Sequence, residues 1–355
     1  MTTTATTQAQ NPPARRHWTQ WIGFAAAGWS ALYATIALVW TVTGDGFPFG
    51  TGNPDSIGAL RDLPAEVGAP LFAVILVATT VVTLVMLGRH RPSPRLRAAM
   101  LGFGWLIAGA LLVIVPEPDV LALAGYAPLL IVGAPFGWPP VDYAEVFDWP
   151  LLNLAFAILG GFLVAGAVLA WQRRTHVGDG LPTWVTPAAA ARWSRWAVGV
   201  AVVIPLIYAV TRYAWLLRIP LLVDDEFIDE LHADGAAWAG AWLATFAVIG
   251  AVLTLGLVQR WGERFPRWML GLAGRPVPVR LAVIPASIVS VLVTSAGFGL
   301  GSHVSMSAGP VSGFWIHLPQ LLWPFWGVAL GAATLGYYLR RRPDPAHRGG
   351  RRGPR

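Results

Sequence analysis

The sequence contains no cysteine and no lysine, and only 12% of its 355 residues are charged. Without cysteine, the chain has no disulfide, no thiolate nucleophile, no iron–sulfur cluster and no thiolate zinc site. Without lysine, it has no Schiff-base lysine and no GxxxxGKS or GxxxxGKT phosphate-binding loop, which argues against an ATP-driven machine in this chain. All 25 basic residues are therefore arginine.

Apolar sequence is what the chain has in excess, with 55% hydrophobic residues and a mean hydropathy of +0.56. These values lie outside the range of soluble globular domains. A helix needs about 20 apolar residues to cross about 30 Å of hydrocarbon, and eight segments meet this condition. They predict an all-α polytopic membrane bundle of eight transmembrane helices, at residues 18–43, 66–88, 97–115, 150–171, 196–217, 237–258, 280–301 and 317–339.

The arginines predict how the chain is oriented in the bilayer. With eight spans, 22 of the 25 arginines fall on one side, and the other side keeps only Arg61, Arg212 and Arg218. The positive-inside rule then places both termini in the cytoplasm. The alanine-rich, glycine-rich and lysine-free composition is typical of GC-rich bacterial genomes, so we expect a protein of the bacterial cytoplasmic (plasma) membrane.

A ninth apolar run, residues 121–136, is shorter than the others and is broken by Pro128. If this run also crossed the bilayer, every later arginine cluster would move to the outer side. We therefore predict that segment 116–149 is re-entrant or interfacial on the outer face. Simple packing against the bundle is the alternative.

Internal similarity indicates two parallel four-helix repeats. The stretches SALYATIALVW and PLIYAVTRYAW align without a gap, which pairs Tyr33 with Tyr208 and Trp40 with Trp215 and leaves Ala37 opposite Arg212. Transporters place their sites at such repeat interfaces. The predicted division is a cytoplasmic N-terminal tail 1–17, a first membrane half 18–175, a cytoplasmic linker 176–195, a second membrane half 196–339 and a disordered Arg-rich cytoplasmic tail 340–355.

The fifth span carries the sharpest candidate site. Its residues Pro205, Tyr208, Arg212 and Trp215 recur at helical spacing and share one face. An arginine near mid-membrane costs about 2.5 to 3.5 kcal/mol on the insertion scale, so we expect Arg212 to bind an anionic group or to pair with an outer carboxylate. Snorkelling to the outer interface is the alternative.

The acidic stretch LLVDDEFIDELHADG, residues 221–235, follows this span. As a helix it would place Asp225 and Asp229 on one face beside an apolar edge, which predicts a short amphipathic element on the outer membrane surface. We expect an outer lid whose carboxylates neutralise Arg212 and Arg218 or compete with an anionic ligand for them. The candidate substrate-binding or gating residues are Tyr208, Arg212, Trp215, Arg218, Asp225 and Asp229.

Metal binding is only weakly indicated, by His232, His303 and His317 in the outer region. Imidazole and carboxylate suit zinc, manganese or iron, but these histidines come from three loops and the chain has a single DxxH where di-metal bundles need two. We therefore expect no metal, no other cofactor and no catalytic residue. Hydroxyls of the seventh span, among them Ser290 and Ser295, are expected to join neighbouring helices.

Three functions remain open, because no motif identifies a family. We favour a transporter or permease-like protein for a small, candidate anionic solute. The alternatives are a non-catalytic membrane scaffold or sensor subunit, with an unidentified partner subunit, and an outer-leaflet membrane-embedded enzyme. The expected partners are the lipid bilayer and, at the cytoplasmic Arg-rich segments, anionic lipid headgroups. Nucleic-acid binding is not expected, since the basic segments lack an aromatic-interleaved fold.

Overall fold

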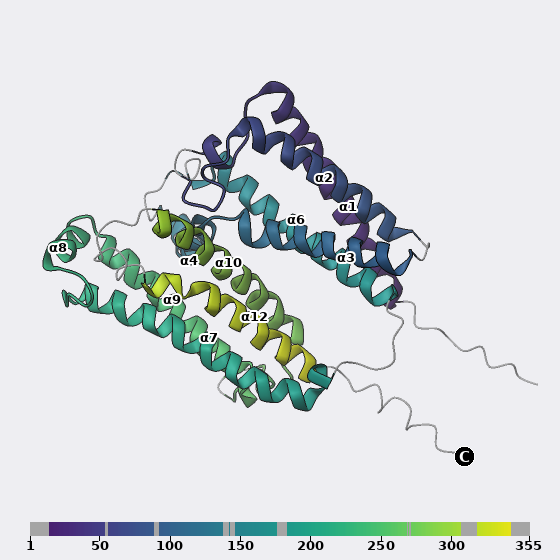
Figure 1. Cartoon of the computed structure of the whole chain (residues 1–355). Coiled ribbons are helices and arrows are strands. Elements are labelled where there is room, and N and C mark those ends of the chain that lie inside the picture. The colour runs from purple at the N-terminus through teal and green to yellow at the C-terminus, as the bar shows by residue number, and fades with distance from the viewer. Residues whose placement is uncertain are drawn as a thin grey trace, which may run out of the picture. The chain divides into compact units, whose positions relative to one another are not determined.

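The computed structural model of the chain is all-helical (Figure 1). It describes residues 14–53, 56–88, 92–137, 142, 146–175, 183–267, 269, 271–306 and 318–341, with side chains at 14–20 and 302–306 outside the description. Ten α-helices lie within these residues, and eight helical segments are long and apolar enough to cross a membrane. The prediction of a helical multipass membrane protein with eight apolar helices is confirmed to that extent.

The eight segments are not quite the predicted set. They are 21–43, 65–87, 94–114, 118–136, 149–175, 187–216, 236–256 and 279–301. The segment predicted as re-entrant is among them, as α4 (Pro118–Gly133) with the short helix that follows it. The predicted last span folds as α12 (Trp323–Arg340), which is not among the eight apolar segments.

The chain forms two compact units, and unit 1 comprises residues 1–52, 63–111 and 156–178. It contains α1 (Ala14–Thr43), α2 (Ala65–Leu87), α3 (Pro94–Gly109) and most of α6 (Trp149–Thr175). A chain of aromatic contacts runs through it, and Tyr33, which is fully buried, contacts Trp29, Trp40 and Phe156 with ring centroids 5.2 to 5.7 Å apart. Such pairs add stability beyond the area that they bury.

Unit 2 comprises residues 53–62, 112–155 and 179–355. Besides α4 and α12 it contains α7 (Pro187–Leu216), α8 (Asp225–Ala233), α9 (Ala236–Gly256) and α10 (Val279–Met306). In Figure 1, α12 lies between α7 and α10, while α9 packs on α7 and α4 packs on α10 and α9. We call the end that holds α8 the acidic end, and the end that holds residues 257–278 the basic end.

Local sequence signals explain where several helices begin. Ser93 caps α3 by accepting a hydrogen bond from the Leu96 N–H, and Thr186 caps α7 by accepting one from the Ala189 N–H. In both helices the next residue is a proline, which suits the first helical position because its missing N–H would have no partner there. The cap at Thr186 makes α7 begin earlier than the predicted start at residue 196. Most of the predicted tails, 1–17 and 340–355, lies outside the described residues, and the two predicted repeats remain a prediction.

Candidate functional site

The predicted face of the fifth span surrounds a guanidinium group. Arg212 lies on α7 with its Cζ 5.0 Å from the ring centroid of Tyr208 and 4.3 Å from that of Trp215. Both rings are buried, with exposed fractions of 6% and 1%. Each cation–π contact is worth about 0.5 to 2 kcal/mol, the upper value where water is excluded. The three residues therefore form one unit, as their spacing predicted.

Neighbouring elements hold the rings of Tyr208 and Trp215 in place around Arg212. The Trp215 indole donates from Nε1 to the Leu221 carbonyl over 2.9 Å and meets Phe227 of α8 edge-on. Tyr208 meets Trp323 of α12 edge-on, with ring centroids 5.5 Å apart. Nε1 of Trp323 is buried and has no hydrogen-bond partner in the described part of the chain. A buried donor in this state is unfavourable unless a ligand or water accepts from it.

The acidic stretch forms the predicted amphipathic helix, α8. Asp224 caps it by accepting from the Phe227 N–H, and Ile228 is buried on its apolar side. Asp229 accepts a hydrogen bond from Arg218 over 2.8 Å, and both side chains are exposed. Asp225 is also exposed. One carboxylate of α8, that of Asp229, thus reaches Arg218.

The candidate metal ligands are not gathered into a site in the described residues. Nδ1 of His232 lies 2.9 Å from the Ile228 carbonyl oxygen, and Nε2 lies 3.3 Å from that of Leu216, so both ring nitrogens face backbone acceptors. The side chain of His303 and the whole of His317 fall outside the described residues. Among the residues that are described, no three metal-ligating side chains come together.

A buried carboxyl group, which the sequence did not single out, lies where α3 gives way to α4. Glu117 is 3% exposed, and its Oε1 accepts a hydrogen bond from Ser56 over 2.7 Å. Its Oε2 is buried without a hydrogen-bond partner among the described residues. Burial is the main cause that raises the pKa of Glu117, and nearby Asp119 adds to it, while the Ser56 hydroxyl and the Ile57 backbone act in the opposite direction. Burial therefore shifts the equilibrium of Glu117 toward the neutral acid, relative to an exposed glutamate.

The chain around Glu117 is irregular and closely packed. A π-helical turn, residues 110–114, ends α3, and Pro116 and Pro118 flank the glutamate. Such π-turns occur frequently at functional sites. Ser295 of α10 donates to the Pro116 carbonyl over 2.8 Å, and a Cβ on Gly299 would lie 3.1 Å from Cδ of Pro118. The break between α3 and α4 therefore rests on small residues of α10.

Hydroxyl groups of α10 join neighbouring elements, as predicted. Ser290 donates to the Gly327 carbonyl of α12 over 2.7 Å, and Ser295 donates to Pro116 as described above. Thr294 instead bonds the Ser290 carbonyl of its own helix. Beside the Glu117 break, a cavity of about 240 Å³ is lined in part by Asn53, Asp119 and Asp148.

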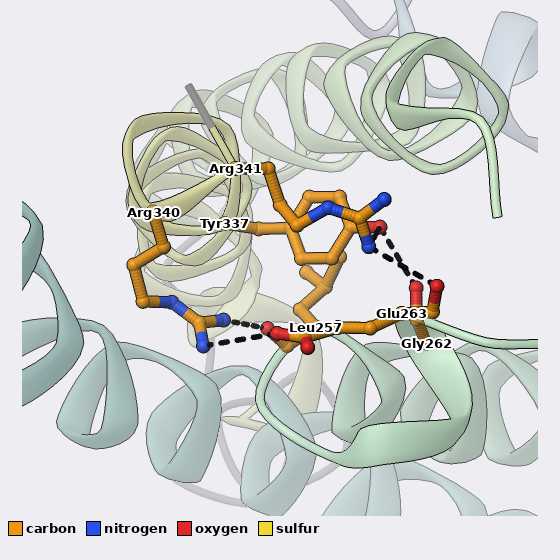
Figure 2. A network of polar contacts seen from close by, with 6 residues as sticks. All are labelled: Leu257, Gly262, Glu263, Tyr337, Arg340 and Arg341. Carbon is orange, nitrogen blue, oxygen red and sulfur yellow. Dashed lines mark hydrogen bonds and ion pairs between the residues drawn. The ribbon is translucent and has the colours of Figure 1, made fainter. Parts of the chain in front are cut away.

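At the basic end, α12 holds the connection between α9 and α10 (Figure 2). Tyr337 donates to the Gly262 carbonyl over 2.8 Å, and Arg341 donates to the carbonyls of Val277 (2.9 Å) and Glu263 (3.3 Å). Arg340 donates to the Leu257 carbonyl, and its guanidinium also lies 3.7 Å from the Glu263 carboxylate. Charged donors make strong hydrogen bonds to carbonyl groups, so this loop is fixed on α12.

Above this loop, an apolar groove of about 820 Å³ opens between α9 and α10. The loop residues Trp261 and Phe265 form its floor, and Trp326 and Leu330 of α12 form its back wall. The groove lies within the size range of small-molecule and cofactor sites.

Neither a protein-family model, nor a curated protein, nor a solved structure matches this chain. Its function must therefore be inferred from the geometry of the sites above.

Proposed function

We propose that this multipass membrane protein is a permease-like transporter that moves a small anionic solute together with a proton. The observation that carries the proposal is the buried Glu117 at the break between α3 and α4. Ionisable residues among membrane-spanning helices are costly to keep, so they mark ion and proton pathways more often than they serve as packing.

A single buried carboxyl group suits reversible proton binding. With a proton, Glu117 is a neutral acid that can stay beside Ser56 and Gly58; without one, it is an anion with one oxygen left unsatisfied. Transferring an ion out of water costs several kcal/mol in proteins, so loss of the proton favours a conformation in which the carboxylate meets water. A protonation step is thereby coupled to movement at the helix break.

The anion would bind near Arg212, and α4 connects that region to Glu117. Leu121 of α4 packs against the core cluster that contains Tyr208. Tyr208 in turn contacts both the Arg212 guanidinium and Trp323, whose buried indole N–H offers a further donor to an anion. A solute anion and the Glu117 proton would then occupy opposite ends of one contact chain.

The membrane orientation belongs to the same proposal. The contacts of α4 support an arrangement in which it lies across the acidic end: Pro118 meets Gly299 near the end of α10, and a Cβ on Gly125 would lie 2.6 Å from Leu243 near the start of α9. In that arrangement α12 crosses the bilayer and α4 does not. Both termini are then cytoplasmic, and the membrane is the bacterial plasma membrane.

The test is proton uptake by proteoliposomes that contain the full chain and a luminal pH-sensitive dye. Acetate, lactate, inorganic phosphate and sulfate are added in turn, and with at least one of them we expect luminal acidification faster than in protein-free liposomes, into which neutral acetic acid already diffuses. Glu117→Gln should reduce that acidification by about tenfold or more, which equals roughly 1.4 kcal/mol. Arg212→Gln should raise the anion concentration needed for half-maximal uptake.

The matched control is Glu226→Gln, which removes an exposed carboxylate on α8 and should leave the rate unchanged. Unchanged uptake in Glu117→Gln would contradict a role for Glu117 in proton movement. A wild-type protein that acidifies the lumen no faster than protein-free liposomes with each of the four anions would contradict the transport proposal.

A further inference from the structure

The groove between α9 and α10 is open along the side of unit 2. In the described residues, α9 packs mainly on α7, α10 packs mainly on α12, and α4 bridges α9 and α10 near the acidic end. Large apolar side chains on both rims of the groove are exposed, with exposed fractions of 61% at Leu253 and 57% at Leu281. In a bilayer, these rims face hydrocarbon, so the groove is open to acyl chains.

The interior of the groove suits a hydrocarbon chain. Its lining is almost entirely apolar, from the rims to Trp326 and Leu330 at the back. Water in an apolar cavity lacks the two to four polar partners that it needs, so a groove of about 820 Å³ open to lipid fills with lipid.

The floor of the groove is a folded structure. The Phe265 N–H donates to the Arg275 carbonyl over 3.0 Å, and the Gly274 N–H returns a bond of the same length to Phe265. A Cβ on Gly256 would lie 2.6 Å from the Trp261 ring, so that ring closes tightly over the end of α9. Together with the α12 contacts of Figure 2, these interactions fix the floor before any ligand arrives. Preorganisation of this kind favours binding.

Positive charge surrounds the same floor. Five exposed arginines lie on the segment that forms the floor and the start of α10: Arg260, Arg264, Arg267, Arg275 and Arg280. The segment's one carboxylate, Glu263, lies 3.7 Å from the Arg340 guanidinium. Arginine is the side chain best suited to phosphate, because its planar group donates two parallel hydrogen bonds.

We propose that this groove is a binding site for one phospholipid with an anionic headgroup, with an acyl chain in the groove and its phosphate among the floor arginines. The apolar groove selects a lipid over a free phosphate, and the arginines select an anionic lipid over a zwitterionic one. The site does not depend on the transport proposal, since it lies at the opposite end of unit 2 from Glu117 and Arg212.

The test uses full-length protein in phosphatidylcholine nanodiscs that contain a minor fraction of phosphatidylglycerol with brominated acyl chains. Bromine atoms quench nearby indoles, and Trp261 and Trp326 line the groove. The site signal is the quenching that disappears in Trp261→Phe. We expect brominated phosphatidylglycerol to produce this signal at a concentration about tenfold lower than brominated phosphatidylcholine.

Two kinds of variant separate the headgroup from the chain. Arg264→Gln combined with Arg275→Gln should abolish the preference for phosphatidylglycerol, whereas Arg192→Gln with Arg195→Gln should keep it, because these two exposed arginines lie at the start of α7, away from the groove lining. Ala286→Phe, which places a ring in the groove, should reduce quenching by both lipids.

Circular dichroism and size-exclusion profiles confirm that each variant is folded. Equal quenching of wild type by the two lipids would overturn the headgroup assignment, as would equal losses in the two double-arginine variants. Unchanged quenching in a folded Ala286→Phe variant would overturn the chain assignment.

Discussion

Gly327 is the position at which a single added methyl group should do most damage to unit 2. It lies where α12 crosses α10, and a Cβ there would be 2.0 Å from Oγ1 of Thr294, 2.6 Å from the Ser290 carbonyl oxygen and 2.7 Å from the Thr294 backbone nitrogen. Two of these three atoms belong to the backbone of α10. They move only if the helices separate, so Gly327→Ala should force α10 and α12 apart.

The loss of unfolding free energy in Gly327→Ala follows from two opposing effects. Overpacking a close-packed interior costs about 1 to 3 kcal/mol. Replacing glycine by alanine inside a helix gains up to about 1 kcal/mol in backbone entropy. We therefore expect Gly327→Ala to lower the free energy of unfolding by roughly 1 to 2 kcal/mol.

Two other helical glycines provide matched controls. A Cβ on Gly331 would meet only the flexible Ser290 hydroxyl, at 2.8 Å, and a Cβ on Gly250 would meet nothing within 4 Å. Gly331→Ala should be close to neutral, because the about 1 kcal/mol lost when the Ser290 hydroxyl turns away from the Gly327 carbonyl offsets the gain of up to about 1 kcal/mol in backbone entropy. Gly250→Ala should be neutral or slightly stabilising.

The assay is reversible unfolding in mixed micelles, followed by tryptophan fluorescence and circular dichroism. The expected order of stability is Gly250→Ala, then Gly331→Ala, then Gly327→Ala. A Gly327→Ala protein as stable as Gly250→Ala would refute the close crossing of α10 and α12. A Thr294→Ala background should not rescue Gly327→Ala, since the two backbone contacts remain.

Three further predictions test the acidic end. Because burial raises the pKa of Glu117, its contribution to stability is complete below the ordinary glutamate pKa and is lost as pH rises through the raised value; pH-dependent unfolding should show this loss in wild type and not in Glu117→Gln. Asp229→Asn should change the free energy of unfolding by less than about 1 kcal/mol, since its ion pair with Arg218 is exposed, and the change should vanish in high salt. A cysteine replacing the exposed Phe136 should react with a membrane-impermeant maleimide from the same side as one replacing the exposed Asp45, which precedes α4 in the loop between α1 and α2; labelling from opposite sides would mean that α4 crosses the bilayer.

Local features were predictable because they depend on local spacing. Helical periodicity placed Tyr208, Arg212 and Trp215 on one face, and in the structure the guanidinium contacts both of those rings. The amphipathic pattern in residues 221–235 likewise predicted α8 and its buried edge. In unit 1, Tyr33 and Trp40 contact each other directly at 5.7 Å, where an alanine stands in place of the arginine.

Features built by distant segments were not predictable in this way. Glu117 is buried by Ser56, 61 residues away, and its helix break is held by Ser295, 179 residues from Pro116. The available signal was a glutamate between two prolines, at the end of an apolar run. The groove between α9 and α10 had no sequence signal at all, since it depends on how far apart these helices are held.

The exchange of α4 for α12 among the apolar helices shows what hydropathy measures in this bundle. In the most apolar stretch of residues 118–136, which contain α4, only 11% of the residues are buried. By contrast, α12 lies between α7 and α10, and half of its residues are buried, mostly small or aromatic ones. A helix that touches mainly other helices can be less apolar than one that touches lipid, because packing contacts replace hydrocarbon contacts along its length. Hydropathy therefore reports exposure to lipid, and exposure also arises on a helix that lies at the membrane surface. The arginine distribution provides independent information. The arginine-rich segments all fall on one side of the membrane only if α12 crosses and α4 does not. Labelling of residue 136 is therefore the measurement that separates an eight-span from a nine-span chain.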